Sequence, residues 1–183
     1  MKIKNIAILA CVLFASLTGF AQEEDYSDYQ GLGKNEFTLN MLYSVAGIPE
    51  IKYERHLSDE SSIGLSAAVA LVDDIDLEYM VTPFYRFYFG NKPSAGFFIE
   101  ANTALFSQDV DYEVYYLSDG GSESRSESEF GFGMGFAAGG KFMTKSGFVF
   151  EIYGGLGRNF LYDDSSYGSE AYPRIGLTFG KRF

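Results

Sequence analysis

The sequence predicts an all-β protein: an eight-stranded antiparallel up-and-down transmembrane β-barrel that follows a cleaved signal peptide. Three observations lead to this prediction. The chain has 14 Tyr and 18 Phe but only 4 Pro, and such a composition favours strands. Runs of about ten residues alternate between large apolar and small or polar positions. The connections between these runs alternate between short and long, as they do in transmembrane barrels.

Residues 1–21 have the pattern of a secretory signal peptide. The segment begins with a short basic stretch, continues with an apolar run over residues 6–14, and ends at the small Ala21. The run is too short to span a bilayer as a helix, although a retained anchor is an alternative interpretation. Cys11 lies in a lipobox-like sequence, so lipidation there is a second alternative. Cleavage after Ala21 would remove the only cysteine and with it any disulfide or thiol chemistry.

The charge of the chain argues against a nucleic-acid partner. The formal charge is −11, and loss of Lys2 and Lys4 with the signal peptide would leave 12 basic residues against 25 acidic ones, a charge of −13. So acidic a protein would be repelled by a phosphate backbone. Residues 22–35 are acidic and contain glycine, a composition that predicts a flexible lead-in before the barrel.

The barrel is predicted over residues 36–183, where period-2 alternation and turn residues divide the chain into eight runs. Each run is close to the roughly 9–11 residues that a tilted strand needs to cross a membrane. No segment has a convincing helical repeat. The eight predicted strands are residues 36–45, 50–58, 62–72, 78–90, 95–107, 129–143, 147–160 and 172–183.

The connections predict the orientation of the barrel. The even-numbered connections are short, and the fifth and seventh, residues 108–128 and 161–171, are long and acidic. Outer-membrane barrels have short periplasmic turns and longer outer loops. We therefore expect a periplasmic N-terminus and extracellular loops at 108–128 and 161–171. Alternation persists beyond residue 108, so the fifth connection predicts a protruding hairpin with an acidic tip, with a disordered loop as the alternative.

The two faces of the runs predict an apolar exterior and a small or charged interior. In the sixth run, Phe130, Phe132, Met134 and Phe136 alternate with glycines. A soluble barrel would bury the large residues, but a small lumen cannot hold Phe from every strand. Arg55, Arg158 and Lys181 fall on the apolar face, so each must lie near a strand end or beyond a bulge. Tyrosines expected in interfacial girdles are Tyr43, Tyr53, Tyr79, Tyr85 and Tyr172.

The interior face is predicted to carry a network of charges. A packed network that closes the lumen is the favoured interpretation, and a water-filled pore is the alternative. The predicted members of this network are Lys52, Glu54, His56, Arg86, Glu100, Lys141, Glu151 and Arg174.

The sequence gives no support for an active site, a metal or a cofactor. His56 is the only histidine, and no nucleophile elbow accompanies it. Asp109, Asp111 and Glu113 resemble the start of a calcium loop but lack its glycine and later glutamate. The glycines at 131, 133 and 135 lie within a strand and form no dinucleotide fingerprint. We therefore expect no enzyme activity and no cofactor.

Several segments resemble a known group of proteins. The sequences of residues 83–89, 96–100, 140–142, 145–151 and 157–159 resemble the small outer-membrane β-barrel proteins of unassigned function that are common in Bacteroidetes. The likeness covers residues 36–183 and implies an OmpA-like barrel without a periplasmic domain. It also implies lipid contact, passage through periplasmic chaperones and the barrel-assembly machinery, and a monomeric state. Phe179 and Phe183 match the assembly signal of such proteins, with Lys181 in place of an apolar residue.

Three functions are compatible with these expectations. The first is a structural or surface-display role with acidic outer loops. The second is passive transport of small solutes or ions through the lumen. The third, a lipid-modifying membrane enzyme, has the least support because the sequence offers no catalytic constellation.

Overall fold

The computed structural model describes residue 29 and residues 31–72, 74–115, 122–161 and 169–183. Internal contacts separate residues 1–30 from a second unit, Gly31–Phe183, which contains every strand. The predicted signal peptide, most of the lead-in and the tip of the fifth connection lie outside the described residues.

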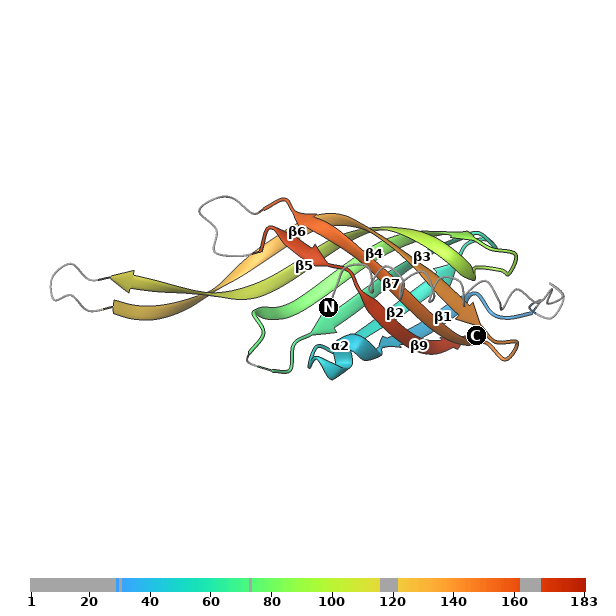
Figure 1. Ribbon diagram of the computed structural model, residues 1–183, viewed down its shortest axis with the longest axis horizontal. Helices are drawn as coiled ribbons and strands as arrows, with labels where there is room; N and C mark the ends of the chain where they lie inside the picture. Colours follow the sequence, from blue (N-terminus) through green and yellow to red (C-terminus); the bar gives the residue numbers. More distant parts are fainter. Residues whose placement is uncertain (1–28, 30, 73, 116–121, 162–168) are drawn as a thin grey trace, which may run out of the picture. The chain divides into compact units, whose positions relative to one another are not determined.

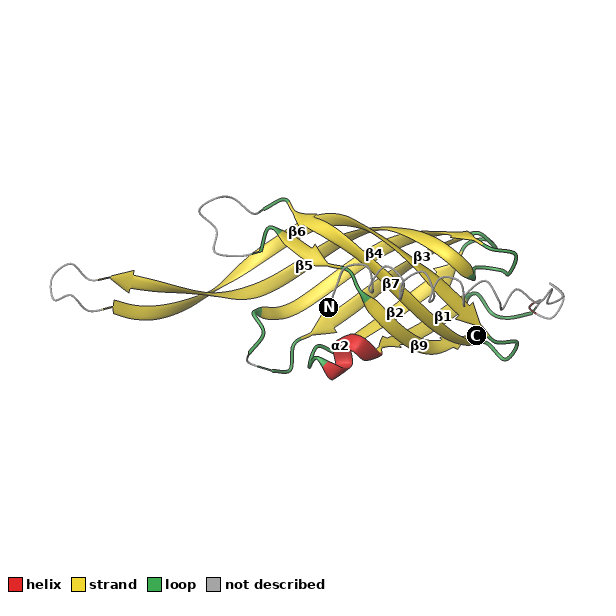
Figure 2. Ribbon diagram, viewed as in Figure 1, coloured by secondary structure: helices red, strands yellow, loops and turns green. Residues whose placement is uncertain are grey.

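The second unit is built almost entirely from strands (Figures 1 and 2). No helix in the described part of the chain is long and apolar enough to cross a bilayer. The elements are β1 (Asn35–Asn40), α2 (Met41–Val45), β2 (Glu50–His56), β3 (Ser61–Val69), β4 (Leu77–Phe89), β5 (Gly96–Tyr115), β6 (Ser122–Met143), β7 (Phe148–Asn159), β8 (Ala171–Pro173) and β9 (Gly176–Arg182).

The sheet closes on itself. Neighbouring strands pair antiparallel from β1 through β7, and β9 closes the barrel by pairing with both β1 and β7. The short β8 also pairs with β7, so β8 and β9 are two parts of one interrupted strand. Between them, the Arg174 amide donates to the Gly155 carbonyl at 3.0 Å and keeps the chain on β7. The predicted eight-stranded antiparallel β-barrel is confirmed.

The first predicted strand is too long. β1 ends at Asn40, and residues 41–45 form α2, although the alternation of Met41 and Tyr43 predicted a strand. The Asn40 side chain accepts from the Tyr43 amide at 3.4 Å and so caps the helix. No partner strand remains for this segment, since Asn40 already pairs with Glu50, the first residue of β2. The expectation of no helix was therefore wrong at this position.

The fifth connection contains more strand than loop. β5 and β6 pair continuously from Gly96↔Lys141 to Tyr115↔Ser122. β4 leaves β5 at the pair Leu77↔Gln108, and β7 leaves β6 at Gly133↔Asn159. The two long strands therefore extend beyond their neighbours as a two-stranded ribbon, residues 109–115 and 122–128 (Figure 1). This confirms the predicted protruding hairpin, whose tip is not described.

The alternation of faces is confirmed along the barrel strands. In β3, Ile63, Leu65 and Val69 are exposed on the outside, while Ser62 and Ser66 are buried inside. The cations on the apolar face do not require a β-bulge. Strand pairing is regular at Arg55 and Arg158, and both residues lie near strand ends. Lys181 likewise lies one residue before the end of β9.

The barrel end away from the ribbon is held together by the short turns. Asn35 and Phe183 exchange two backbone hydrogen bonds, at 3.1 and 2.8 Å. The Arg182 guanidinium donates to the carbonyl oxygens of Gly33 and Pro93 at 2.6 and 3.0 Å. These bonds join segments that are distant in sequence and hold this end of the barrel together. We call this end the cross-braced rim.

Candidate functional site: the charged interior

The eight residues predicted to form the charged network all lie inside the barrel, and none has more than 2 % of its surface exposed. They come from β2, β4, β5, β6, β7 and the break between β8 and β9. A charge in such an interior must be paired or hydrated, since an isolated one would cost several kcal/mol. In the structure, each of these eight residues is paired with another charged residue inside the barrel.

Arg86 of β4 is the centre of the network. Its guanidinium donates to Glu100 at 2.7 Å, to Glu151 at 2.8 Å and to Glu54 at 3.0 Å. The guanidinium carbon also lies 4.2 Å from the centroid of the Phe98 ring, a distance favourable for a cation–π contact. A fully buried cation is thus neutralised by carboxylates from three other strands.

Lys141 of β6 occupies a position that otherwise resembles a metal site. The carboxylates of Glu36, Glu54 and Glu151 offer oxygen atoms within 4.8 Å of one another. The Lys141 ammonium lies 2.9, 3.0 and 3.0 Å from these three carboxylates, respectively. A cation is therefore already supplied by the protein, so this cluster is an ion-pair centre instead of a candidate metal site.

Lys52 and Arg174 are two further cations of the network. The Lys52 ammonium pairs with Glu151. Arg174, which lies between β8 and β9 on the interior face, pairs with Glu50 at 2.6 Å and with Glu100 at 2.8 Å. Together with Arg86, these contacts link seven positions around the barrel wall through its centre.

His56 is a member of the network and not part of a nucleophilic triad. Its Nε2 lies 3.2 Å from Glu36, and its Nδ1 lies 3.8 Å from Glu54. The nearby Ser62 hydroxyl donates to Glu54 at 2.6 Å, so it is not activated by the imidazole. Tyr88 also donates to Glu54. This arrangement holds the Glu54 carboxylate by hydrogen bonds from Ser62 and Tyr88.

Sequence reasoning missed three charged residues that the interior contains. Glu36, Glu50 and Arg182 are buried with 1 %, 3 % and 7 % of their surface exposed. Strand parity could have found them, because Glu36 shares a face with Thr38 and Glu50 shares one with Lys52. With these residues, the buried charged set of the described chain comprises five glutamates and five lysines or arginines, so its formal charges balance without protonation of His56.

The interior also holds several aromatic side chains, although the size argument predicted that the lumen could not hold Phe from every strand. Phe84, Tyr88, Phe98, Phe106, Tyr153 and Tyr172 are all buried. Space for them comes from glycines on neighbouring strands. A β-carbon at Gly64 would lie 2.1 Å from the Phe84 ring, and one at Gly176 would lie 2.4 Å from Tyr153. The small residues of the interior face therefore leave room for rings, several of which lie directly against the buried cations.

Tyr172 was wrongly assigned to an interfacial girdle. Only 3 % of it is exposed, and its hydroxyl donates to Asn102 at 2.8 Å. Tyr172 and Arg174 share one parity of the strand, so both lie inside the barrel. Tyr79 and Tyr85 are exposed on the outside, each at 46 %, while Tyr43 and Tyr53 are partly exposed.

The predicted assembly-signal residues lie on the exterior. Phe179 and Phe183 are exposed at 50 % and 56 %. Phe179 stacks on Phe148 of β7, with ring centroids 5.9 Å apart, and Phe183 stacks on Phe37 of β1 at 6.0 Å. Both rings therefore belong to the apolar outer surface at the seam where β9 closes the barrel.

Comparison with protein-family models, with curated proteins and with solved structures found no match. The resemblance to small outer-membrane barrels of Bacteroidetes therefore stays a prediction from the sequence. What the geometry provides is an eight-stranded barrel with an apolar outside and an interior that is filled and electrically balanced.

Proposed function

We propose that this protein is an outer-membrane β-barrel with a structural and surface-display role. The observation that carries the proposal is the inversion of the ordinary distribution of side chains. Large apolar residues are exposed on the outside of the barrel strands, with Phe136 exposed at 75 % and Leu156 at 69 %. Exposed apolar patches of this extent are rare in monomeric soluble proteins, whereas a lipid-facing surface requires them.

The orientation follows from the two ends of the barrel. In outer-membrane barrels the periplasmic end has the short turns, and the longer elements are extracellular. The cross-braced rim, with its short turns at residues 57–60, 90–95 and 144–147, fits the periplasmic end. The ribbon and the connection at 161–171 would then face outward. The acidic ribbon would then be the part of the protein that is accessible to other molecules.

The interior supports a structural role over transport. Arg86, Phe98 and Glu151 are fully buried near the middle of the lumen, and a chain of ion pairs joins opposite walls. An eight-stranded barrel has an interior just wide enough for side chains. A conducting path would require several of these buried pairs to separate, so we propose a barrel that is closed to solutes.

Two experiments test the proposal. The first fractionates cells that express the protein and compares gel mobility before and after boiling. We expect the protein in the outer-membrane fraction, with a folded form that migrates differently from the boiled form. Recovery in the soluble fraction without a mobility shift would overturn the membrane assignment.

The second experiment records single-channel currents from the purified barrel in a planar bilayer. We expect no discrete conductance steps, because the interior is filled. Reproducible steps from the folded, unsubstituted barrel would establish transport through the lumen and contradict the structural role.

A further inference from the structure

The ribbon of β5 and β6 has a backbone edge without a partner strand in the described part of the chain. The last contact on the β4 side is the Asp109 amide, which donates to the Asp76 carbonyl at 2.6 Å. From Val110 to Tyr115, β5 is paired with β6 alone. Unpaired edges of this kind are templates for the addition of another strand.

The positions of the free backbone groups follow from the ladder. In a strand, alternate residues direct their amide and carbonyl groups to the same side. Because the Asp109 amide faces β4, the free groups on the same edge belong to Asp111, Glu113 and Tyr115. On the other edge of the ribbon, the Phe132 carbonyl accepts from Phe160 on the β7 side. The free groups of β6 therefore include those of Ser126, which pairs directly opposite Asp111.

The charge of the ribbon limits what can pair with this edge. Residues 109–129 contain seven acidic residues and one arginine, a formal charge of −6. Asp111 and Glu113 are themselves edge positions of β5. A second copy of the same edge would bring like charges together, which is unfavourable across paired strands. A cationic strand would instead bring opposite charges into register.

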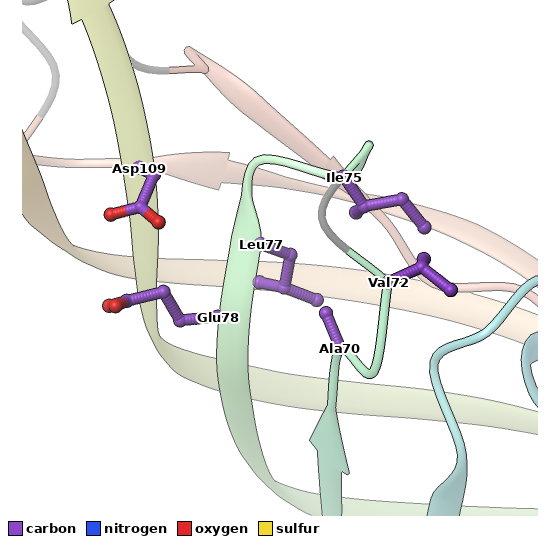
Figure 3. A pocket seen from close by; sticks show the side chains of 6 residues that line it. All are labelled: Ala70, Val72, Ile75, Leu77, Glu78 and Asp109. Atoms are coloured by element: carbon purple, nitrogen blue, oxygen red, sulfur yellow. The ribbon is translucent and has the colours of Figure 1, made fainter. Parts of the chain in front are cut away.

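A pocket lies where this edge begins. It has a volume of about 330 Å³ and is lined by Ala70, Val72, Ile75, Leu77, Glu78 and Asp109. Figure 3 shows the carboxylates of Glu78 and Asp109 near each other, beside the apolar side chains of the 70–77 segment. An apolar wall with carboxylates suits a lysine or arginine side chain, whose methylene stem packs on apolar groups while its cation pairs.

We propose that the β5 edge of the ribbon binds an extended cationic polypeptide segment by strand addition, with a basic side chain of that segment in the pocket lined by Glu78 and Asp109. The backbone edge supplies hydrogen bonds, and the acidic positions and the pocket select a basic sequence. This inference rests on the proposed display role, to which it adds the chemical class of the partner.

Binding is tested on the purified full-length barrel in neutral detergent, so the outcome does not depend on where the protein resides in the cell. The probe is a fluorescein-labelled peptide of four Lys-Thr repeats, and the control is the same peptide with Glu in place of Lys. We expect the basic peptide alone to raise the fluorescence anisotropy saturably. Hydrogen exchange should then show new protection at the amides of Asp111 and Glu113.

A matched pair of proline variants separates strand addition from simple charge attraction. Asp111→Pro removes an amide of the β5 edge, and Ser126→Pro removes the opposite amide on the β6 edge. Proline is tolerated at edge positions whose amide faces solvent, and the mobility shift on gels verifies folding. Asp111→Asn removes only the charge. We expect Asp111→Pro to weaken peptide binding roughly fivefold more than Asp111→Asn, and Ser126→Pro to have no effect.

Three outcomes would overturn the proposal. Equal losses for Asp111→Asn and Asp111→Pro, without new amide protection, would reduce the interaction to charge attraction. A loss for Ser126→Pro alone would assign binding to the β6 edge. Dimerisation of the purified protein in sedimentation experiments, abolished by Asp111→Pro, would make a second copy the occupant. In addition, Glu78→Gln should lower the affinity severalfold, and an unchanged affinity would exclude the pocket as the anchor.

Discussion

Arg86 bonds to β2, β5 and β7 from its place on β4 and so joins four strands of the barrel. It is also flanked by the rings of Phe84 and Phe98, at 4.7 and 4.2 Å. The arginine is suited to this place because its planar guanidinium can meet several carboxylates and a ring together. Lys141 performs a different task with a compact ammonium that three carboxylates surround.

Replacement of Arg86 by leucine should destabilise the barrel strongly. Glu54, Glu100 and Glu151 would each lose a partner while remaining buried, and breaking a buried pair typically costs about 3–5 kcal/mol. The measurement is equilibrium unfolding in urea, followed by the gel mobility of the folded form. Arg55→Leu is the control, because Arg55 is exposed near a strand end. Equal midpoints for the two variants would show that the network contributes little to stability.

Much of the interior could be predicted from parity alone. Lys52, Glu54 and His56 alternate with Ile51, Tyr53 and Arg55, and the structure buries the first three. The same parity applies to two rings. Tyr88 and Phe98 share faces with Arg86 and Glu100 and are buried with them. The pairs themselves could not be predicted, since they depend on the stagger of the closed sheet, which no local pattern encodes.

At the scale of the elements, glycines and rings form complementary pairs across neighbouring strands. Gly64 of β3 lies under the Phe84 ring of β4, and Gly157 of β7 lies under the Tyr172 ring of β8. A ring that lies over a glycine of the next strand covers backbone that would otherwise be poorly packed. The strands thus keep a narrow lumen filled without a large residue at each interior position.

The substitution Gly64→Val should destabilise the barrel, because a β-carbon would lie 2.1 Å from the Phe84 ring and 2.6 Å from the Tyr53 carbonyl oxygen. Overpacking of this kind costs about 1–3 kcal/mol. Gly154→Val is the matched control, since nothing lies within 4 Å of a β-carbon there. Urea unfolding of both variants checks the prediction. A Gly154→Val variant as unstable as Gly64→Val would mean that strand propensity, and not the ring contact, governs both positions.

Element boundaries were predictable where a strand had neighbours on both sides and failed where it did not. β3 and β7 begin and end within a few residues of their predicted limits. At residues 41–45, alternation continued without a partner strand, and the chain formed α2. Near residue 174, the predicted strand of residues 172–183 is interrupted between β8 and β9. Both departures depend on contacts between segments that are distant in sequence.

At the scale of the whole molecule, the barrel has an exterior suited to lipid and an interior that is closed. The exposed apolar positions run along the barrel strands, and the cations among them lie near strand ends. The length and parity of the connections predicted this organisation, as did the faces of the strands. The proposed outer-membrane location explains both properties. Contact with lipid requires an apolar exterior, and a narrow lumen favours a closed interior.

A lipid environment makes a position-dependent prediction for the exterior. Leu65→Arg, in the middle of β3, should lower the free energy of unfolding in phospholipid vesicles by about 2–4 kcal/mol. Leu57→Arg makes the same chemical change in a short turn outside the strands, where the cost should fall to about 0–1 kcal/mol. Unfolding in urea, measured in vesicles, compares the two. Equal effects would argue that the middle of the barrel is not in contact with hydrocarbon.

The ion pairs of the interior also have a consequence for the order of events during folding. Their partners are far apart along the chain: 99 residues separate Lys52 from Glu151, 105 separate Glu36 from Lys141, and 124 separate Glu50 from Arg174. In the proposed membrane environment, an open sheet would leave these charges on one uncovered face, where lipid could not solvate them. Their burial therefore has to wait for the seam between β1 and β9. Closure and charge neutralisation become a single late step, and the high contact order makes that step slow.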